Sequence, residues 1–301
     1  MDRTFRQKIK MKANKFSLIG LGRLGTCLGR ALSGSKFKVV GLFDIQPASA
    51  QESHQLLGQG KTCSTLKEAV TAGDIIFLTV RDDALPEVVQ QLSLLPIDWS
   101  EKYIFHCSGF YSSSLLAPLK NKGALTGSLH PIQSFPAKNL PPQIFQKIFF
   151  TFEGESQAQS LAEEMVTALG GQLINLPPEK KPLYHTACSL ASNHLVGLIL
   201  ASAKLLEKAG FSLEKATAML LPLARQTLEN IQSLGLEKSL TGPLQRGDLR
   251  TVTEHLKILA SFPQTREIYA ALSLFLLELA DKQGSLSSEQ KQHLKHLLVK
   301  K

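Results

Sequence analysis

A glycine pattern near the start of the chain constrains the fold more than any other feature. A short apolar run at 16–19 leads into GLGRLG at 20–25, and a helical pattern follows at 26–32. In a G-x-G-x-x-G turn between a strand and a helix, the first glycine allows the sharp turn. The second lets the backbone approach a pyrophosphate, and the third packs the helix close to the sheet. The alternative interpretation is a glycine-rich turn without a ligand.

The same pattern indicates which residues would hold a cofactor. These residues are Gly20, Leu21, Gly22, Arg23, Leu24 and Gly25. A second strand is expected at 37–43, and Asp44 follows it, where an acidic side chain would bind the ribose hydroxyls of a dinucleotide. Asp44 would repel a 2′-phosphate, and residues 45–47 provide no cation. The predicted cofactor is therefore NAD or NADP, with NAD favoured.

The order of the expected elements predicts the domain organisation. Strand-like and helix-like segments alternate as far as residue 176, which is typical of an α/β fold with a doubly wound, largely parallel sheet. Pro177-Pro178 ends the alternation, and the rest is helical in pattern, beginning with one long helix at 180–209. We therefore expect a basic tail at 1–15, a Rossmann dinucleotide-binding domain at 16–176 and an all-helical substrate and dimerisation domain at 177–301.

Charge and cysteine content narrow the classes of partner. The net charge of +9 comes from the two ends, with +5 in residues 1–15 and +4 in residues 291–301, so the body is neutral and no nucleic-acid face is expected. Four scattered cysteines form no C-x-x-C pair, and no metal-ligand spacing is present. Without a signal-peptide core or an apolar run near 18 residues, we expect a cytoplasmic protein with no membrane or metal partner. An organellar address at the N-terminus is the less favoured alternative.

Polar residues follow the predicted strands on the edge where open α/β sheets bind ligands. Those expected at the cofactor are Val80, Arg81, Asp82 and Ser108. His106 is expected at the substrate, and His130 is the candidate for acid–base catalysis because the pKa of histidine lies near neutrality. The alternatives are a buried His106 bonded to a backbone carbonyl and a His130 that caps the turn before Pro131.

The predicted helix at 180–209 carries a polar stripe, because helical spacing places His185, Ser189, Ser192 and Asn193 on one face. Such a stripe either faces a cleft or pairs within a core. We expect Asn193 to orient a carbonyl or the cofactor's carboxamide, Ser189 to donate to the substrate, and His185 to assist catalysis.

One arginine in the helical half is a candidate for binding an anionic substrate. Arg246, in a turn at 241–248, could clamp a carboxylate in bidentate fashion. Pairing of Arg246 with Asp248 or with a helix end is the equal alternative.

Four segments resemble a bacterial family that joins a Rossmann-like domain to a helical domain of unknown function, provisionally named NADP-dependent oxidoreductases. They are IGLGRLGTCLGRAL (19–32), HCSGFYSSSLLAPLKNKGALTGSLHPIQSF (106–135), YHTACSLASNHLVGL (184–198) and LTGPLQRGDLRTVTEHL (240–256). The architecture is also similar to pyrroline-5-carboxylate reductase, ketopantoate reductase, the deazaflavin-dependent NADP oxidoreductases and the 3-hydroxyacid dehydrogenases. The resemblance implies a helical domain like the C-terminal domain of 6-phosphogluconate dehydrogenase, which completes the active site and builds a homodimer.

Two departures from these relatives limit what the resemblance implies. The 3-hydroxyacid dehydrogenases carry a lysine four positions before the asparagine that Asn193 matches, but this chain has Ser189 there. Relatives commonly have V-P-D-D after the fourth strand, where Arg81 follows Val80 here. The leading hypothesis is an NAD(P)-dependent oxidoreductase acting on a small carbonyl, imine or hydroxyacid. A non-catalytic dinucleotide sensor or interaction protein is the alternative, and a protein that binds another adenine-containing ligand is a third.

Overall fold

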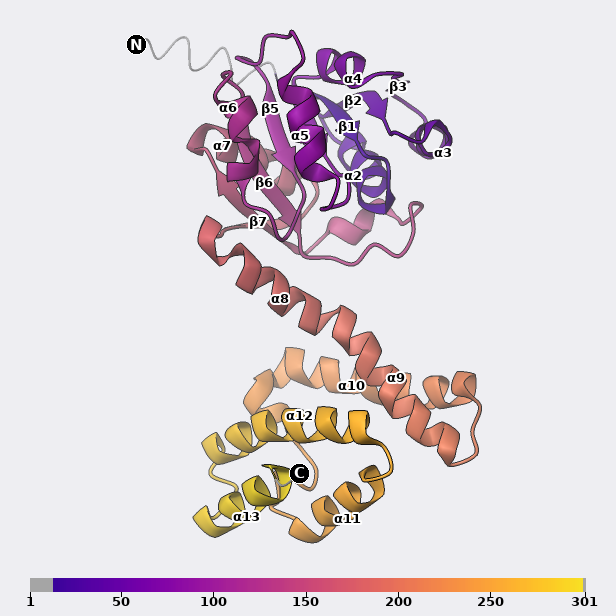
Figure 1. Ribbon diagram of the computed structural model, residues 1–301, viewed down its shortest axis with the longest axis vertical. Helices are drawn as coiled ribbons and strands as arrows, with labels where there is room; N and C mark the ends of the chain where they lie inside the picture. Colours follow the sequence, from indigo (N-terminus) through magenta and orange to yellow (C-terminus); the bar gives the residue numbers. More distant parts are fainter. Residues whose placement is uncertain (1–12, 300–301) are drawn as a thin grey trace. The chain divides into compact units, whose positions relative to one another are not determined.

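The first half of the chain builds one eight-stranded sheet in the computed structural model, which describes residues 13–299 (Figure 1). The strands are β1 (Lys15–Ile19), β2 (Lys38–Phe43), β3 (Lys61–Thr62), β4 (Ile75–Leu78), β5 (Tyr103–His106), β6 (Leu125–Pro131), β7 (Phe149–Gly154) and β8 (Gln172–Asn175). Their order is β3-β2-β1-β4-β5-β6-β7-β8, and every pair is parallel except β6 and β7. Most of the predicted basic tail, residues 1–12, lies outside the described residues.

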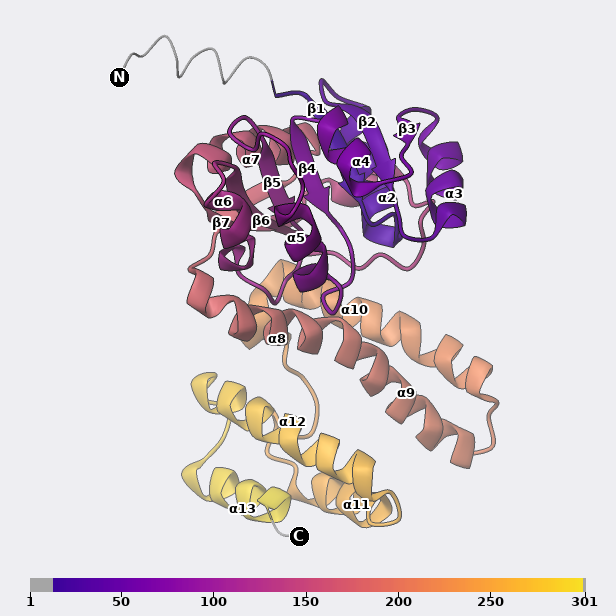
Figure 2. The same cartoon turned by 45° about the horizontal axis from the view of Figure 1, so that its top comes forward.

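Helices cover both faces of the sheet (Figure 2). On one face lie α2 (Arg23–Ser33), α3 (Pro47–Leu57) and α7 (Ser156–Ala168), and on the other α4 (Leu66–Ala72), α5 (Leu85–Ser93) and α6 (Ala117–Lys120). Strand β4 alternates between the two cores, with Ile75 and Phe77 in one and Ile76 and Leu78 in the other. Burial on both faces explains its unbroken apolar sequence. The predicted doubly wound, mostly parallel α/β fold is confirmed.

The strand order reverses between β1 and β4, and this reversal positions the candidate site. The chain builds β2 and β3 on one side of β1 and then crosses to β4 on the other side. Loops that leave two such neighbouring strands diverge, which opens a crevice at their carboxyl ends. The glycine turn follows β1 at this edge, and His106 and His130 lie near the ends of β5 and β6.

The chain divides into two compact units, residues 1–189 and residues 190–301, and each is described by itself. The N-terminal unit thus extends past the expected boundary at residue 176. It includes most of α8 (Lys181–Ala191), because Lys181 and Tyr184 bond to residues at the strand ends. Three short 3₁₀ turns complete this unit, at Ser113–Leu116, Pro142–Phe145 and Pro178–Lys180.

The C-terminal unit is helical, as predicted. It contains α9 (Asn193–Lys208), α10 (Leu213–Ser239), α11 (Leu249–Leu259), α12 (Pro263–Lys282) and α13 (Ser288–Val299). Leu277, Val252 and Leu294 belong to its small core, where α11, α12 and α13 meet. Gly235 interrupts α10 with a non-helical backbone, at φ +80° and ψ 166°.

The helix expected at 180–209 is present as two consecutive segments, α8 and α9, with a break at one residue between them. The backbone leaves helical geometry at Ser192 (φ −117°, ψ −71°), which separates α8 from α9. Serine and asparagine favour helix starts over helix interiors, because their side chains compete for backbone hydrogen bonds. The polar stripe from His185 to Asn193 therefore does not lie on one continuous helix.

One helical run among the described residues, Pro178–Lys208, is long and apolar enough to cross a membrane by length and composition. Core helices of soluble proteins pass the same test, so this is weak evidence for a membrane span. Several apolar side chains of the run are exposed, among them Leu190, Val196 and Leu200.

Candidate functional site

The turn between β1 and α2 is tightly packed beneath and open above. Gly20 has φ +95°, and a Cβ there would lie 2.6 Å from the Val80 nitrogen. A Cβ on Gly25 would lie 2.3 Å from the Gly20 oxygen, so only glycine lets the helix approach this closely. At Gly22, by contrast, no described heavy atom lies within 4 Å of the Cβ position. A ligand can therefore approach the backbone at Gly22.

The first turn of α2 is suited to an anion. Gly22 is the N-cap residue and offers no side-chain cap, while Arg23 is exposed at the first helical position. The first amide groups of a helix have no partner within the helix, and the helix dipole favours negative charge there. A diphosphate would satisfy these amides, so the residues present fit the diphosphate of a dinucleotide.

Asp44 is held beside this turn by backbone hydrogen bonds. Its Oδ2 accepts from the Leu21 amide at 2.7 Å, and its Oδ1 accepts from the Gln46 amide at 2.9 Å. A carboxylate oxygen can accept more than one hydrogen bond, so each oxygen keeps capacity for a ribose hydroxyl. The position and fixed orientation of Asp44 also fit a dinucleotide.

A cation that the sequence did not reveal lies at the start of α3. Lys138 Nζ donates to Ser49 Oγ at 2.8 Å and to Glu52 Oε2 at 2.7 Å, although Lys138 lies 89 positions after Ser49. Ser49 Oγ in turn donates to the Leu21 carbonyl at 3.0 Å. Arg30 of α2 bonds to the carbonyl of Leu140, which holds this segment between β6 and β7 against the helix.

The loop after β4 lies against the glycine turn. Thr79 Oγ1 donates to the Gly20 carbonyl at 2.6 Å, and Val80 is half-buried beside Gly20. Arg81 is exposed and pairs with Asp83 at 2.8 Å, while Asp82 is half-buried. The cofactor contacts expected of Val80, Arg81 and Asp82 stay predictions.

His130 and Tyr184 form a hydrogen-bonded pair at the end of β6. His130 Nδ1 lies 2.6 Å from the Tyr184 hydroxyl, and the two rings meet edge to face. Burial lowers the pKa of His130 to about 3, with smaller contributions from the charges of Lys181 and His185. Burial also raises the pKa of Tyr184. Both side chains are therefore uncharged near neutral pH.

His185 joins this pair from α8, one residue after Tyr184. Its ring centre lies 6.3 Å from that of His130, and its buried Nδ1 has no hydrogen-bond partner among the described residues. Gly109 fills the space between them, because a Cβ on Gly109 would lie 2.6 Å from His185 Nδ1 and 2.9 Å from His130 Nε2. The structure thus brings together two of the predicted catalytic residues, His130 and His185.

His106 and Ser108 accept hydrogen bonds from backbone amides of the loop that follows β5. His106 is fully buried, its Nδ1 accepts from the Ser108 amide at 3.3 Å, and burial lowers its pKa to about 3. The contact expected between His106 and a substrate stays a prediction. The Ser108 hydroxyl accepts from the amides of Phe110 and Tyr111 at 3.1 and 3.0 Å, so it caps the loop.

A buried lysine lies beneath this cluster, and the sequence analysis missed it. Lys181 is 1% exposed, and its Nζ lies 2.6 Å from Ser128 Oγ, 3.0 Å from the Ser108 carbonyl and 3.9 Å from Glu153 Oε1. Glu153 is buried as well and accepts from the amide and hydroxyl of Ser113. In the sequence, Lys181 follows Lys180 after a double proline, which is typical of exposed charge, so no pattern signals its burial.

The other predicted residues lie elsewhere in the chain. Ser189 is half-buried in α8, at the end of the N-terminal unit, whereas Asn193 is exposed at the start of α9 in the C-terminal unit. Arg246 is exposed, and Asp248 caps α11 through Thr251, at 3.0 Å to its amide and 2.7 Å to its hydroxyl. The substrate roles of Ser189, Asn193 and Arg246 stay predictions.

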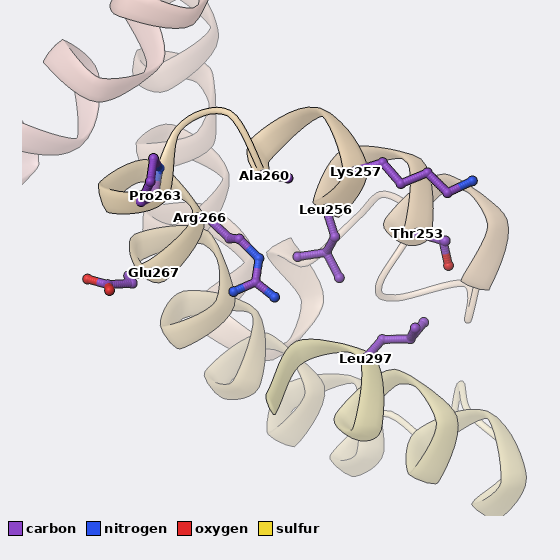
Figure 3. A pocket seen from close by; sticks show the side chains of 8 residues that line it. All are labelled: Thr253, Leu256, Lys257, Ala260, Pro263, Arg266, Glu267 and Leu297. Atoms are coloured by element: carbon purple, nitrogen blue, oxygen red, sulfur yellow. The ribbon is translucent and has the colours of Figure 1, made fainter. Parts of the chain in front are cut away.

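A pocket of 500 Å³ in the C-terminal unit differs in character from the strand-end cluster (Figure 3). Its lining residues are Thr253, Leu256, Lys257, Ala260, Pro263, Arg266, Glu267 and Leu297. The guanidinium of Arg266 points into the space between Leu256 and Leu297. These residues come from α11, α12, α13 and the turn between α11 and α12, and the lining includes no histidine or tyrosine.

Comparison with protein families matches both halves of the chain. Residues 3–131 match a Rossmann-like domain, and residues 148–275 match a domain of unknown function, DUF2520. The chain combines a Rossmann-like domain with a DUF2520 domain. The domain pairing expected from the four sequence segments is confirmed. No curated protein sequence matches this Rossmann–DUF2520 chain.

Solved structures share the architecture of the Rossmann–DUF2520 chain. BF3122 from Bacteroides fragilis, provisionally named an NADP oxidoreductase, is 23% identical, with a TM-score of 0.72 over 88% of this chain and 98% of that one. Protein TM1727 from Thermotoga maritima is 25% identical, with a TM-score of 0.70 over 89% and 99%. A reductive aminase from Aspergillus terreus, in complex with NADPH and ethyl-5-oxohexanoate, is 16% identical, with a TM-score of 0.61 over 95% and 93%. At such identities, the likeness to BF3122 and the aminase shows the fold alone.

Proposed function

We propose that the protein is a nicotinamide-dinucleotide-dependent oxidoreductase that transfers a hydride between the nicotinamide and a small carbonyl, imine or hydroxyacid. One observation carries the proposal. A single sheet edge combines an open glycine turn and a fixed acid, Asp44, with an uncharged His130–Tyr184 pair. The names of the structural neighbours, an NADP oxidoreductase and an NADPH-bound reductive aminase, support the same reaction class.

The residues of the glycine turn bind and orient the cofactor in this proposal. The amides of α2 hold the diphosphate, and Asp44 holds the ribose. When bound, the nicotinamide supplies or accepts the hydride. The loops after β4 and β5 lie between the glycine turn after β1 and His130 in β6, because the strand order is β1-β4-β5-β6. They contain Val80, Arg81, Asp82 and Ser108, the other residues expected at the cofactor.

His130 handles the proton. We assign the Tyr184 hydroxyl as the donor to Nδ1 of His130, which places the imidazole proton on Nε2, the atom beside Gly109. From Nε2 the imidazole donates its proton to a substrate oxygen as negative charge develops there, while the Tyr184 hydroxyl passes its own proton to Nδ1, so the imidazole stays neutral. The tyrosinate then takes a proton from solvent, and the oxidation direction reverses these transfers. A neutral imidazole can donate in this way without first becoming an imidazolium. Ser189 and Asn193 would orient the substrate, and Arg246 would bind an anionic group on it.

The choice between NAD and NADP depends on two opposing charges. Asp44 disfavours a 2′-phosphate, which supports NAD. Lys138 supplies a cation beside Ser49, at the start of the helix that follows Asp44, which supports NADP. We propose that the protein binds both dinucleotides, with Asp44 giving NAD the advantage.

Calorimetric titration with NADH and NADPH, followed by a turnover screen with carbonyl and imine substrates, tests the proposed activity. We expect binding of both dinucleotides and turnover that His130→Ala abolishes. Absence of binding at millimolar concentrations would overturn the proposal. Binding without turnover across both substrate classes would instead favour the dinucleotide sensor. Binding of an S-adenosyl ligand in place of either dinucleotide would favour another adenine-containing ligand.

We also propose that the helical unit forms a homodimer. Helices α9 and α10 expose large apolar side chains, among them Val196, Leu223, Leu228 and Leu236. Exposed apolar surface of this kind marks an interaction site more often than a free surface. Light scattering coupled to size exclusion should give twice the mass of the chain, and Leu223→Glu should give a monomer. A monomeric wild type would contradict the proposal, and recovery of the wild type only with detergent would favour a membrane surface.

A further inference from the structure

Lys181 and Glu153 form a buried ionic pair, and the ammonium of Lys181 bonds to Ser128, two residues before His130 in β6. Both side chains are almost fully inaccessible, at 1% and 3% exposure. Lysine and glutamate are almost never this buried without partners, because removing each charge from water costs several kcal/mol. Burying this pair therefore requires that the surrounding groups satisfy both charges.

The surroundings of the pair meet that requirement. The ammonium donates to Ser128 Oγ and to the Ser108 carbonyl, and Glu153 lies within ion-pair distance. The carboxylate accepts at 2.5 and 2.6 Å from the amide and hydroxyl of Ser113. Each charge thus has a built set of partners.

These partners belong to the segments that carry the candidate site. Ser108 precedes Gly109 in the loop after β5, and Ser128 lies in β6 two residues before His130. Glu153 lies in β7, and Lys181 begins α8, one turn before Tyr184 and His185. The ammonium therefore joins α8 to the strands that hold the other half of the His130–Tyr184 pair.

We propose that Lys181 is a positioning residue for this site: together with Glu153 it ties α8 to the ends of β5 and β6 and so sets the geometry of His130 against Tyr184. This inference rests on the proposed function for its effect on turnover. Lys181 does not itself reach the reacting atoms, because it is buried beneath the loop at Ser108.

The lysine also acts on His130 through its charge. The titratable groups around His130 are Tyr184, His185, Lys181 and Cys188 from α8, His106 from β5 and Glu153 from β7. Burial is the largest cause of the low pKa of His130, and the charge of Lys181 is the second largest. The same two causes come first and second for the low pKa of His106. Removing the charge should therefore raise the pH at which His130 takes up a proton.

The test uses the full chain and a neutral replacement of the pair. Lys181→Met alone would leave Glu153 charged, buried and without its ion-pair partner, which strongly destabilises a fold. The double variant Lys181→Met/Glu153→Gln removes both charges and keeps an acceptor oxygen for the Ser113 amide. Lys180→Met is the matched control, because the neighbouring lysine is exposed.

Two readouts separate positioning from general stability. NMR of the ¹⁵N-labelled His130 ring in the free protein should show protonation at higher pH in the double variant than in the wild type and in Lys180→Met. With a dinucleotide and substrate identified by the titration and turnover screen proposed above, the double variant should lose about tenfold or more in kcat at unchanged dinucleotide affinity.

Unchanged His130 titration and unchanged kcat in a folded double variant would overturn the proposal. A loss of kcat that only follows the folded fraction, measured by thermal unfolding, would also overturn it. The ring titration requires neither cofactor nor turnover. It therefore tests the role of Lys181 even if the wild type binds no dinucleotide, which would be a failure of the proposed function alone.

Discussion

The glycine turn after β1 and the charged cluster around Lys181 lie at the same edge of the sheet but are built in opposite ways. The turn lies within six consecutive residues, 20–25, three of which are glycines. Because these glycines have no side chains, the backbone amides stay open to a ligand. The cluster works through side chains from β6, β7 and α8, joined by bonds between residues 53 and 73 positions apart. The turn is therefore suited to binding a ligand, and the cluster to holding His130, the proposed proton carrier, against Tyr184. Substitutions in the two regions should change different quantities.

Loss of the proton carrier should give the largest effect and leave the turn intact. His130→Ala removes the only imidazole bonded to Tyr184 among the described residues, so kcat should fall by about 10²- to 10⁴-fold, the usual contribution of a positioned acid–base group. The dissociation constant for NADH should stay unchanged, because His130 lies outside the turn. Steady-state kinetics and calorimetry measure the two quantities.

A second histidine–tyrosine pair provides the control for His130. His255 Nδ1 lies 3.1 Å from the Tyr269 hydroxyl in the C-terminal unit, and these rings also meet edge to face. His255→Ala removes the same kind of pair but changes no residue at the strand ends, so kcat should stay unchanged. Equal losses in the two variants would show that the cluster has no special role.

Acid should act on the cluster and spare the turn. The pKa values of His106 and His130 fall from 6.5 to about 3 in the folded protein, so below pH 6.5 the unfolded chain binds protons that the folded chain refuses. Stability is therefore complete above pH 6.5 and falls as the pH drops toward 3. Each histidine should cost about 2 kcal/mol at pH 5. Urea unfolding at pH 7 and pH 5 measures the difference.

His106→Asn isolates one of these histidines from the carboxylates that also titrate in acid. Asparagine can still accept a hydrogen bond from the Ser108 amide, but its side chain takes up no proton. The variant should therefore lose less stability than the wild type between pH 7 and pH 5. An identical loss in both proteins would show that His106 does not resist protonation.

The two regions also differ in how far the sequence reveals them. The turn is visible because each glycine answers a local backbone demand, and the alternation of elements is enough to predict the doubly wound sheet. The sequence predicts a role for His130 because a polar, titratable side chain stands at the end of an apolar strand. Lys181 is not visible, because its burial depends on partners that only the folded sheet brings together. The break at Ser192 is missed because a polar residue in a helical pattern looks like part of a stripe.

Substitution at the open glycine should weaken binding without affecting the fold. A Cβ at position 22 meets no described atom within 4 Å, so Gly22→Ala should leave the thermal midpoint unchanged or slightly higher. The methyl group would instead occupy the approach of a diphosphate and weaken dinucleotide affinity about tenfold, which equals about 1.4 kcal/mol. Gly197→Ala in α9 is the control, since its Cβ also meets nothing described. Equal dinucleotide affinity in the two variants would place the ligand elsewhere.

The smallest effect should appear in the choice of cofactor, where the two charges beside the turn oppose each other. Asp44→Asn keeps an acceptor for the Leu21 amide but removes the negative charge, so affinity for NADPH should rise relative to NADH. Lys138→Met removes the cation at Ser49 and should shift the ratio the other way. Because Lys138 is partly exposed and already paired with Glu52, each change should be worth about 0.5–1 kcal/mol, or roughly two- to fivefold.

The matched control for cofactor choice is Lys36→Met, which removes another surface ion pair, to Glu164, away from the turn. The ratio of the NADPH and NADH dissociation constants at fixed ionic strength decides the outcome, because salt weakens exposed charge interactions. If Asp44→Asn and Lys138→Met shifted the ratio in the same direction, the two charges could not both act on the 2′-position. The lysine would then be only a clamp between the β6–β7 segment and α3.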